Sequence, residues 1–89
     1  MCRNIKPLFN FEPPATELEI HEASLQFVRK VTGFRKPSKA NEAAFEAAVD
    51  AIAAAAGQLL NSLETNAPPR NRLVEAARAH ARAERRFAA

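Results

Sequence analysis

The chain has 89 residues, a net charge of +3, one cysteine, and hydrophobic residues at 47% of its positions. A chain of this length forms one domain, and it buries only about 60–65% of the surface that its unfolded form exposes. Much of the hydrophobic content is alanine and Trp and Tyr are absent, so the six phenylalanines must supply much of the core volume. A homodimer would compensate for so modest a core. The single cysteine excludes an internal disulfide.

Neither a targeting segment nor a membrane span is predicted. Residues 1–14 carry bases but no apolar run of the length that a signal peptide needs. The most apolar stretch, residues 43–63, is interrupted by Glu46, Asp50 and two amide side chains. It therefore falls short of the roughly 18 apolar residues of a membrane helix. We expect a cytoplasmic protein without a membrane partner.

The first helix is predicted over about residues 16–32, after an extended arm at residues 1–15. The arm contains three prolines and no helical period, and its Leu8, Phe9 and Phe11 are apolar enough to pin it across the helices. Thr16 followed by Glu19 has the spacing of a capping box, and Gly33 is typical of a helix end. The expected inner face is Ile20, Ala23, Phe27 and Val31, with Val28 beside them.

A second helix is predicted over about residues 40–63, after a loop that contains Pro37. Either Ser38 or Asn41 is expected to cap it. Gly57 costs about 1 kcal/mol relative to alanine, which indicates close packing at that point. The expected inner stripe keeps the helical period and consists of Phe45, Ala48, Val49, Ile52, Ala56, Leu59, Leu60 and Leu63.

A third helix is predicted over about residues 69–87, because the two prolines before it end the second helix and Pro69 suits a first helical position. We expect it to dock loosely and to fray near its end. Its expected inner face is Leu73, Ala76, Ala77, His80, Ala83 and Phe87. The sequence thus predicts an all-α fold: one domain, residues 1–89, with an antiparallel helical hairpin, a third helix and an N-terminal arm.

Motifs for catalysis or metal binding are absent from the sequence. Cys2, His21 and His80 lie on three different predicted elements, and none has a partner at the spacing that metal ligands use on a helix. We therefore predict no catalytic residue, no metal and no cofactor. Cys2 is a candidate reactive thiol, since removal of Met1 would leave it at the terminus beside Arg3. The alternative is an unremarkable exposed thiol on the arm.

The predicted hairpin loop is strongly basic and is the best candidate for a binding site. Five bases fall within eleven residues that contain no acid, and Phe34 lies among them. Clusters of this kind bind the phosphates of a polyanion. The alternative is a solvated helix end whose charges keep the loop soluble. The candidate residues are Arg29, Lys30, Phe34, Arg35, Lys36 and Lys39.

Over nearly its full length the chain resembles a family of short bacterial proteins of unknown function. The motifs that carry the resemblance are MCRNIK at 1–6, LFNFEPPAT at 8–16, QFVRKVTGFRKPSKANEAAF at 26–45 and TNAPPR at 65–70. They are specific, but the family brings no activity with it. The resemblance therefore implies membership of a domain family without an assigned function.

Residues 8–72 are also similar, more weakly, to the J-domains of co-chaperones. The resemblance rests on Pro14, Thr16, Glu19, Ile20, Ala23, Phe45 and Pro68–Pro69. It implies a helical hairpin that docks on a partner protein. The His-Pro-Asp motif of a J-domain loop is missing, because residues 31–37 read VTGFRKP. The resemblance therefore does not extend to stimulation of a chaperone ATPase.

Two functions are predicted from these observations. The first is a non-enzymatic binding module whose basic hairpin tip contacts nucleic acid or another polyanion. The alternative is a J-domain-like adaptor that binds a partner protein without stimulating a chaperone ATPase. The partners expected are therefore nucleic acid or an acidic protein, and a homodimer is compatible with either function.

Overall fold

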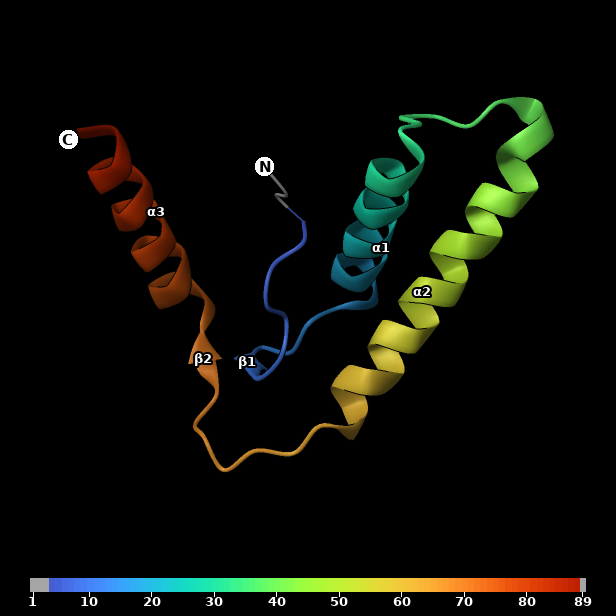
Figure 1. Cartoon of the computed structure of the whole chain (residues 1–89). Helices are drawn as coiled ribbons and strands as arrows, with labels where there is room; N and C mark the ends of the chain where they lie inside the picture. The colour runs from blue at the N-terminus through green and yellow to red at the C-terminus, as the bar shows by residue number, and fades with distance from the viewer. Residues whose placement is uncertain (1–3, 89) are drawn as a thin grey trace.

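The structure is a computed structural model that describes the backbone of residues 4–88 and the side chains of residues 4–86. Its elements in chain order are β1 (Phe11–Glu12), α1 (Glu17–Thr32), the 3₁₀ turn η1 (Lys39–Asn41), α2 (Glu42–Ser62), β2 (Arg70–Asn71) and α3 (Arg72–Ala88) (Figure 1). The two strands are two residues long and pair in parallel. The predicted all-α fold is therefore confirmed.

Helix α1 begins and ends where the sequence predicts. The Thr16 hydroxyl accepts a hydrogen bond from the backbone N–H of Glu19 at 3.2 Å, and the Glu19 carboxylate accepts one from the backbone N–H of Thr16 at 3.1 Å. This is the predicted capping box. At the other end Gly33 has a φ of 75°, a left-handed conformation that favours glycine, and its N–H donates to the Arg29 carbonyl.

Helix α2 runs back along α1, which confirms the hairpin, but the predicted cap is wrong. The side chains of Ser38 and Asn41 make no capping bond to the helix backbone. Instead the Asn41 amide donates to the Ser38 hydroxyl at 3.1 Å. The two candidate capping side chains therefore bond to each other rather than to the backbone of α2. The chain enters α2 through the 3₁₀ turn η1.

The core lies in the seam between α1 and α2. Val28, Phe45 and Val49 are buried, and Leu25, Ala48 and Ile52 pack against them. On α1 the predicted inner face is partly wrong, because Phe27 and Val31 are 46% and 65% exposed. Ser24 is buried in the seam instead, and its hydroxyl donates to the Ile20 carbonyl at 2.8 Å. That bond satisfies the buried hydroxyl, so the seam contains a serine that an apolar pattern does not identify.

The predicted stripe of α2 is correct at its N-terminal and central turns and wrong at its end. Leu59 and Leu63 are 57% and 45% exposed. Helix α2 has 21 residues whereas α1 has 16, so α1 does not cover the whole of α2. Of the last turn of α2, only Leu60 is partly covered, beside Leu8 and Phe9 of the arm.

Helix α3 begins at Arg72 rather than at the predicted Pro69. Arg70 and Asn71 pair with β1 instead, and the Asn71 side-chain oxygen then caps α3 by accepting from the backbone N–H groups of Leu73 and Val74 at 2.9 and 3.1 Å. The predicted inner face is partly wrong. Ala76 does line a hollow shared with the arm and Ala83 is half-buried, but other members point to solvent. Leu73 is 83% exposed, and His80 is exposed and pairs with Glu84 at 2.7 Å. The side chain of Phe87 lies outside the described residues.

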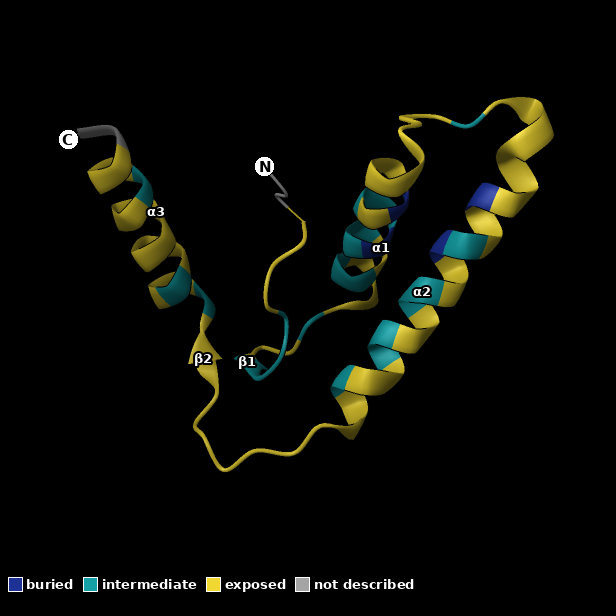
Figure 2. Ribbon diagram, viewed as in Figure 1, coloured by how far each residue is buried: buried dark blue, intermediate teal, exposed yellow. Residues whose placement is uncertain are grey.

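The hairpin and α3 are arranged as the two sides of a V, and the N-terminal arm lies between them (Figure 1). The molecule measures 43 × 38 × 15 Å, so it is little thicker than a single layer of helices. Most of the ribbon is exposed, and burial concentrates where α1 faces α2 (Figure 2). A second layer that would cover the helix faces is therefore missing from the described part of the chain.

Helix α2 is more apolar than the sequence pattern suggests. Together with η1 it forms a helical segment, Lys39–Ser62, that is long and apolar enough to cross a membrane by length and composition alone. Only 11% of its most apolar window is buried in this structure. Most of this apolar helix is therefore exposed in the structure.

Candidate functional site

The end of the hairpin carries a shallow hollow, which we call the tip groove, with a volume of about 540 Å³. It is lined by residues from the arm, the last turns of α1 and the loop: Asn4, Gln26, Arg29, Lys30, Gly33, Phe34 and Arg35. Three of these residues are cationic and none is acidic. The structure thus brings Arg29, Lys30, Phe34 and Arg35 of the predicted cluster together.

Hydrogen bonds fix the shape of the tip groove. The Arg29 Nε donates to the Arg35 carbonyl at 3.0 Å, which closes the turn after α1. On the side of the arm, the backbone N–H of Asn4 donates to the Gln26 side-chain oxygen at 2.7 Å. The groove is therefore bounded by two parts of the chain that are distant in sequence.

Phe34 is held at the edge of the groove. Its backbone N–H donates to the Thr32 hydroxyl at 3.1 Å, and that hydroxyl donates to the Val28 carbonyl at 2.7 Å. The phenylalanine is 44% exposed. An aromatic ring with part of its surface in water beside three cations is suited to stacking on a planar ligand.

Full positive charges dominate the electrostatics of the groove. The C-terminal end of α1 contributes about half a negative charge, which Arg29, Lys30 and Arg35 together outweigh. Within residues 4–86, none of these three cations forms an ion pair with a carboxylate. The groove is therefore suited to an anion.

Lys36 and Lys39 are not part of the tip groove. Lys36 lines a different hollow beside Glu42, Glu46 and Asp50, so acids surround its charge. Lys39 is the first residue of η1, the 3₁₀ turn that leads into α2. Lys36 shares its hollow with His21 and Leu25 on another side of α1, so the predicted cluster of five bases is divided between the tip groove and other surfaces.

The remaining sequence candidates that the structure describes, His21 and His80, do not form a site. Cys2, the candidate reactive thiol, lies outside the described residues. His21 is exposed, and His80 is an exposed partner of Glu84. Within the described part of the chain, no three His, Cys, Asp or Glu residues lie close enough together to hold a metal ion.

An ion pair that the sequence analysis missed joins the hairpin to α3. The Arg72 guanidinium donates from Nη1 and Nη2 to the two carboxylate oxygens of Glu19, at 2.9 and 3.0 Å, and from Nε to the Pro13 carbonyl at 2.8 Å. The hydrogen bond from Arg72 lowers the pKa of Glu19, and the bond from the Thr16 backbone lowers it further. Glu19 therefore both caps α1 and anchors α3.

The same place holds the arm. Asn10 adopts a φ of 62°, which asparagine tolerates, and its amide donates to the carbonyls of Ala67 and Pro68. The Phe11 ring lies 5.7 Å from the Arg70 guanidinium and 5.4 Å from that of Arg72. We call this set the junction: Asn10, Phe11, Glu19, Arg70 and Arg72. Asn10, Phe11 and Arg70 belong to the family motifs at 8–16 and 65–70, but nothing in the sequence connects the two motifs to each other.

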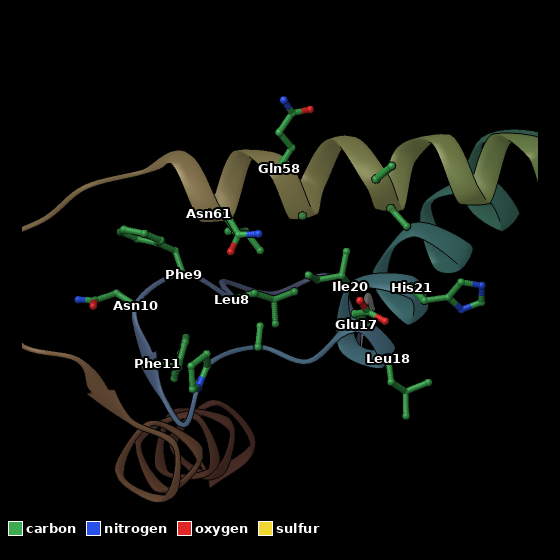
Figure 3. Close-up of a pocket in the computed structure, with 16 residues that line it drawn as sticks. Leu8, Phe9, Asn10, Phe11, Glu17, Leu18, Ile20, His21, Gln58 and Asn61 are labelled. Carbon is green, nitrogen blue, oxygen red and sulfur yellow. The ribbon is translucent and has the colours of Figure 1, made fainter.

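A larger hollow of about 910 Å³ lies between the arm, the start of α1 and the C-terminal half of α2 (Figure 3). Apolar side chains such as Leu8, Phe9 and Ile20 line much of it, and its polar residues include Glu17 and His21. This lining does not combine a nucleophile with a base and an oxyanion site. Most of the residues that line the hollow are apolar.

Comparison with known proteins supports the first of the two resemblances. No curated protein and no solved structure matches the chain. A model of one family, described as an uncharacterized conserved protein (DUF2277), matches residues 1–78, which include the tip groove, the junction and the first part of α3. The chain therefore belongs to the DUF2277 family of uncharacterized conserved proteins.

Proposed function

We propose that the protein is a non-enzymatic binding module that contacts nucleic acid, or a chemically similar polyanion, through the tip groove. The observation that supports this function best is the convergence of Arg29, Lys30 and Arg35 in one hollow without an acid. Each cation that meets a phosphate releases a counterion, which favours binding. Lys36 and Lys39 contribute less, because they lie on another surface.

Single-stranded nucleic acid fits the groove better than a duplex. The groove is formed by a helix end and a loop, so it presents no helix side that could enter a major groove. Phe34 instead offers an exposed ring beside the cations, and bases of a single strand stack on such rings. The proposed ligand is therefore a short single strand whose phosphates lie along the three bases.

The test is the affinity of the full chain for a fluorescein-labelled single-stranded 12-mer, measured by anisotropy over a range of salt concentrations. The double variant Arg29→Gln/Arg35→Gln is expected to bind at least tenfold more weakly. The slope of log affinity against log salt should fall by about 1.4, since each phosphate contact contributes about 0.7 with a single strand. Phe34→Leu should weaken binding about tenfold without changing the slope.

The matched control is Lys36→Gln/Lys39→Gln, which removes the same charge from the same loop. It should leave binding within about twofold of the unchanged chain. If both double variants lose affinity equally, binding depends on net charge and the tip groove is not a site. Competition by inorganic polyphosphate at equal phosphate concentration would show that the groove does not distinguish nucleic acid from other polyanions.

The alternative, a protein-interaction adaptor, is favoured by a separate observation. Helix α3 exposes Leu73 and Val74 although both are apolar. The hairpin α1–α2 has the general shape that the J-domain resemblance implies, but its loop has no His-Pro-Asp motif. The alternative function therefore does not include stimulation of a chaperone ATPase.

A further inference from the structure

The side of α3 that faces the rest of its own chain carries both charged and apolar residues. Three charged residues and two alanines of α3 line the hollow that it shares with the arm: Arg72, Glu75, Ala76, Ala79 and Arg82. The more apolar side, which carries Leu73 and Val74 with Ala77 and Ala81, is exposed. In a stable single domain an amphipathic helix turns its apolar side toward the core. Helix α3 therefore presents to solvent the side that a partner would cover.

The total surface of the protein is also too large for a self-contained domain. It amounts to 7219 Å², whereas a compact monomer of this mass exposes about 5,200 Å². The radius of gyration is 15.8 Å, compared with about 12 Å for a compact chain of this length. The surplus is about 2,000 Å² per chain. Two copies that covered each other's surplus would bury about 4,000 Å², an area typical of permanent dimers.

The hairpin contains a groove that fits a helix. The hollow of about 910 Å³ and a second hollow of about 350 Å³ share His21, so they adjoin along the seam of α1 and α2. We call the combined hollow the long groove. Its lining on α2 extends from Glu42 to Asn61, a length of about 28 Å at 1.5 Å per residue. Helix α3 has 17 residues and is about 25 Å long.

The charges of the long groove and of α3 are complementary. Around the groove, Glu17, Glu42, Glu46 and Asp50 face a single base, Lys36. Helix α3 carries five arginines and two glutamates. Arg78 and Arg85 are seven residues apart and lie on one side of the helix, next to the apolar face. An α3 whose apolar face entered the groove would bring these arginines toward the acids of its rim.

In this structure, α3 does not reach the long groove of the same chain. The junction holds the start of α3 through the Arg72–Glu19 ion pair and the pairing of β2 with β1. The N-terminal arm then lies between α3 and the hairpin (Figure 1). A second copy of the chain has no such constraint, and it supplies both a matching helix and a matching groove.

We propose that the protein forms a two-fold symmetric dimer in which α3 of each copy occupies the long groove of the other. The exchange covers the apolar faces of both α3 helices and the surplus surface of both hairpins. It uses the helix-in-groove mode of recognition, with apolar anchors inside and arginines at the rim. The interface is isologous, so the dimer is closed and does not extend into a filament. The tip groove plays no part in this inference.

The test combines two complementary charge reversals and measures mass by light scattering after size exclusion. The unchanged chain is expected to elute at twice its monomer mass of 9.8 kDa. Glu46→Arg/Asp50→Arg makes the groove basic, and Arg78→Glu/Arg85→Glu makes α3 acidic. Each variant alone should be monomeric, with dimer dissociation raised at least tenfold, because its α3 and its groove then carry like charges. An equimolar mixture should recover the dimer, because both contacts are then restored.

All four substituted residues are exposed, so circular dichroism should show unchanged helix content in each variant. Three results would contradict the proposed dimer. An unchanged chain that is monomeric at 100 µM contradicts the dimer. An unchanged chain that dimerises while the mixture of variants stays monomeric shows that the interface lies elsewhere. A monomeric chain that sediments with vesicles of anionic lipid would assign the apolar face of α3 to a membrane surface instead.

Discussion

The two sides of the V are held by different kinds of interaction. The α1–α2 hairpin is joined along its length by apolar side chains centred on Val28, Phe45 and Val49. Within residues 4–86, the hydrogen bonds and the ion pair that join helix α3 to the hairpin and the arm lie near its start, in the junction. Apolar packing over several turns gives a unit that opens cooperatively, whereas polar contacts at one end allow local opening. The hairpin is therefore the stable unit, and α3 depends on the junction.

The largest expected effect is on the hairpin. Phe45→Ala removes a buried ring from a core of few side chains, and it should lower the free energy of unfolding by about 3–5 kcal/mol. Urea titration followed by circular dichroism measures this change. Leu59→Ala is the control because Leu59 lies on the same helix but is 57% exposed, and it should cost less than about 1 kcal/mol. Equal losses would contradict the assignment of the core.

A second prediction distinguishes the stability of α3 from that of the hairpin. Arg72→Ala removes three hydrogen bonds of the junction and should destabilise the docking of α3 by about 1–2 kcal/mol. Amide hydrogen exchange should accelerate in α3 and remain unchanged in the hairpin. Arg86→Ala removes an exposed arginine of the same helix that lies outside the junction, and it should have almost no effect. Faster exchange throughout the hairpin would show that the two sides are one cooperative unit.

The junction also makes the docking of α3 dependent on pH. The fold lowers the pKa of Glu19 below its ordinary value of 4.5, because Arg72 and the Thr16 backbone stabilise the carboxylate. Its contribution is therefore complete well above pH 4.5 and is lost as the pH falls through the lowered pKa. Amide exchange in α3 should accelerate on acidification over that range. In Glu19→Gln this acceleration should disappear, and its persistence would contradict the role of Glu19.

The smallest predicted change in stability concerns Gly57 in the hairpin. Gly57 lies within α2, and a Cβ atom added there would meet the Ile20 Cδ1 at 3.9 Å, which is ordinary contact. Gly57→Ala should therefore stabilise the protein by about 0.5–1 kcal/mol, because glycine lowers the stability of a helix interior. A rise in melting temperature checks this. A fall would mean that the two helices approach more closely at Gly57 than this structure shows.

The hairpin could be predicted from the sequence because local rules determine it. The Thr16–Glu19 capping box, the Gly33 helix end and the stripe through Phe45 and Val49 each depend on residues a few positions apart. Ser24 escaped prediction because the Ile20 carbonyl satisfies its hydroxyl inside the same helix. The basic cluster at the tip was also predicted, but its division between the tip groove and other surfaces depends on the path of the loop.

The junction and the orientation of α3 could not be predicted in this way. Arg72 and Glu19 are 53 residues apart, and Glu19 already had a local role as the partner of Thr16. The apolar face of α3 predicts burial against the same molecule, yet the junction turns Arg72 and Glu75 inward. A pattern on one helix identifies the face to be covered, but it does not identify the molecule that covers it.

One measurement tests most directly whether α3 of one copy occupies the long groove of another. In an equimolar mixture of carbon-13-labelled and unlabelled chain, isotope-filtered nuclear Overhauser spectroscopy detects only contacts between copies. In the proposed dimer, the methyl groups of Leu73 and Val74 of one copy contact those of Leu18 and Leu25, which line the long groove of the other. Contacts of these methyl groups confined to one copy, or to other residues of the second copy, would contradict it.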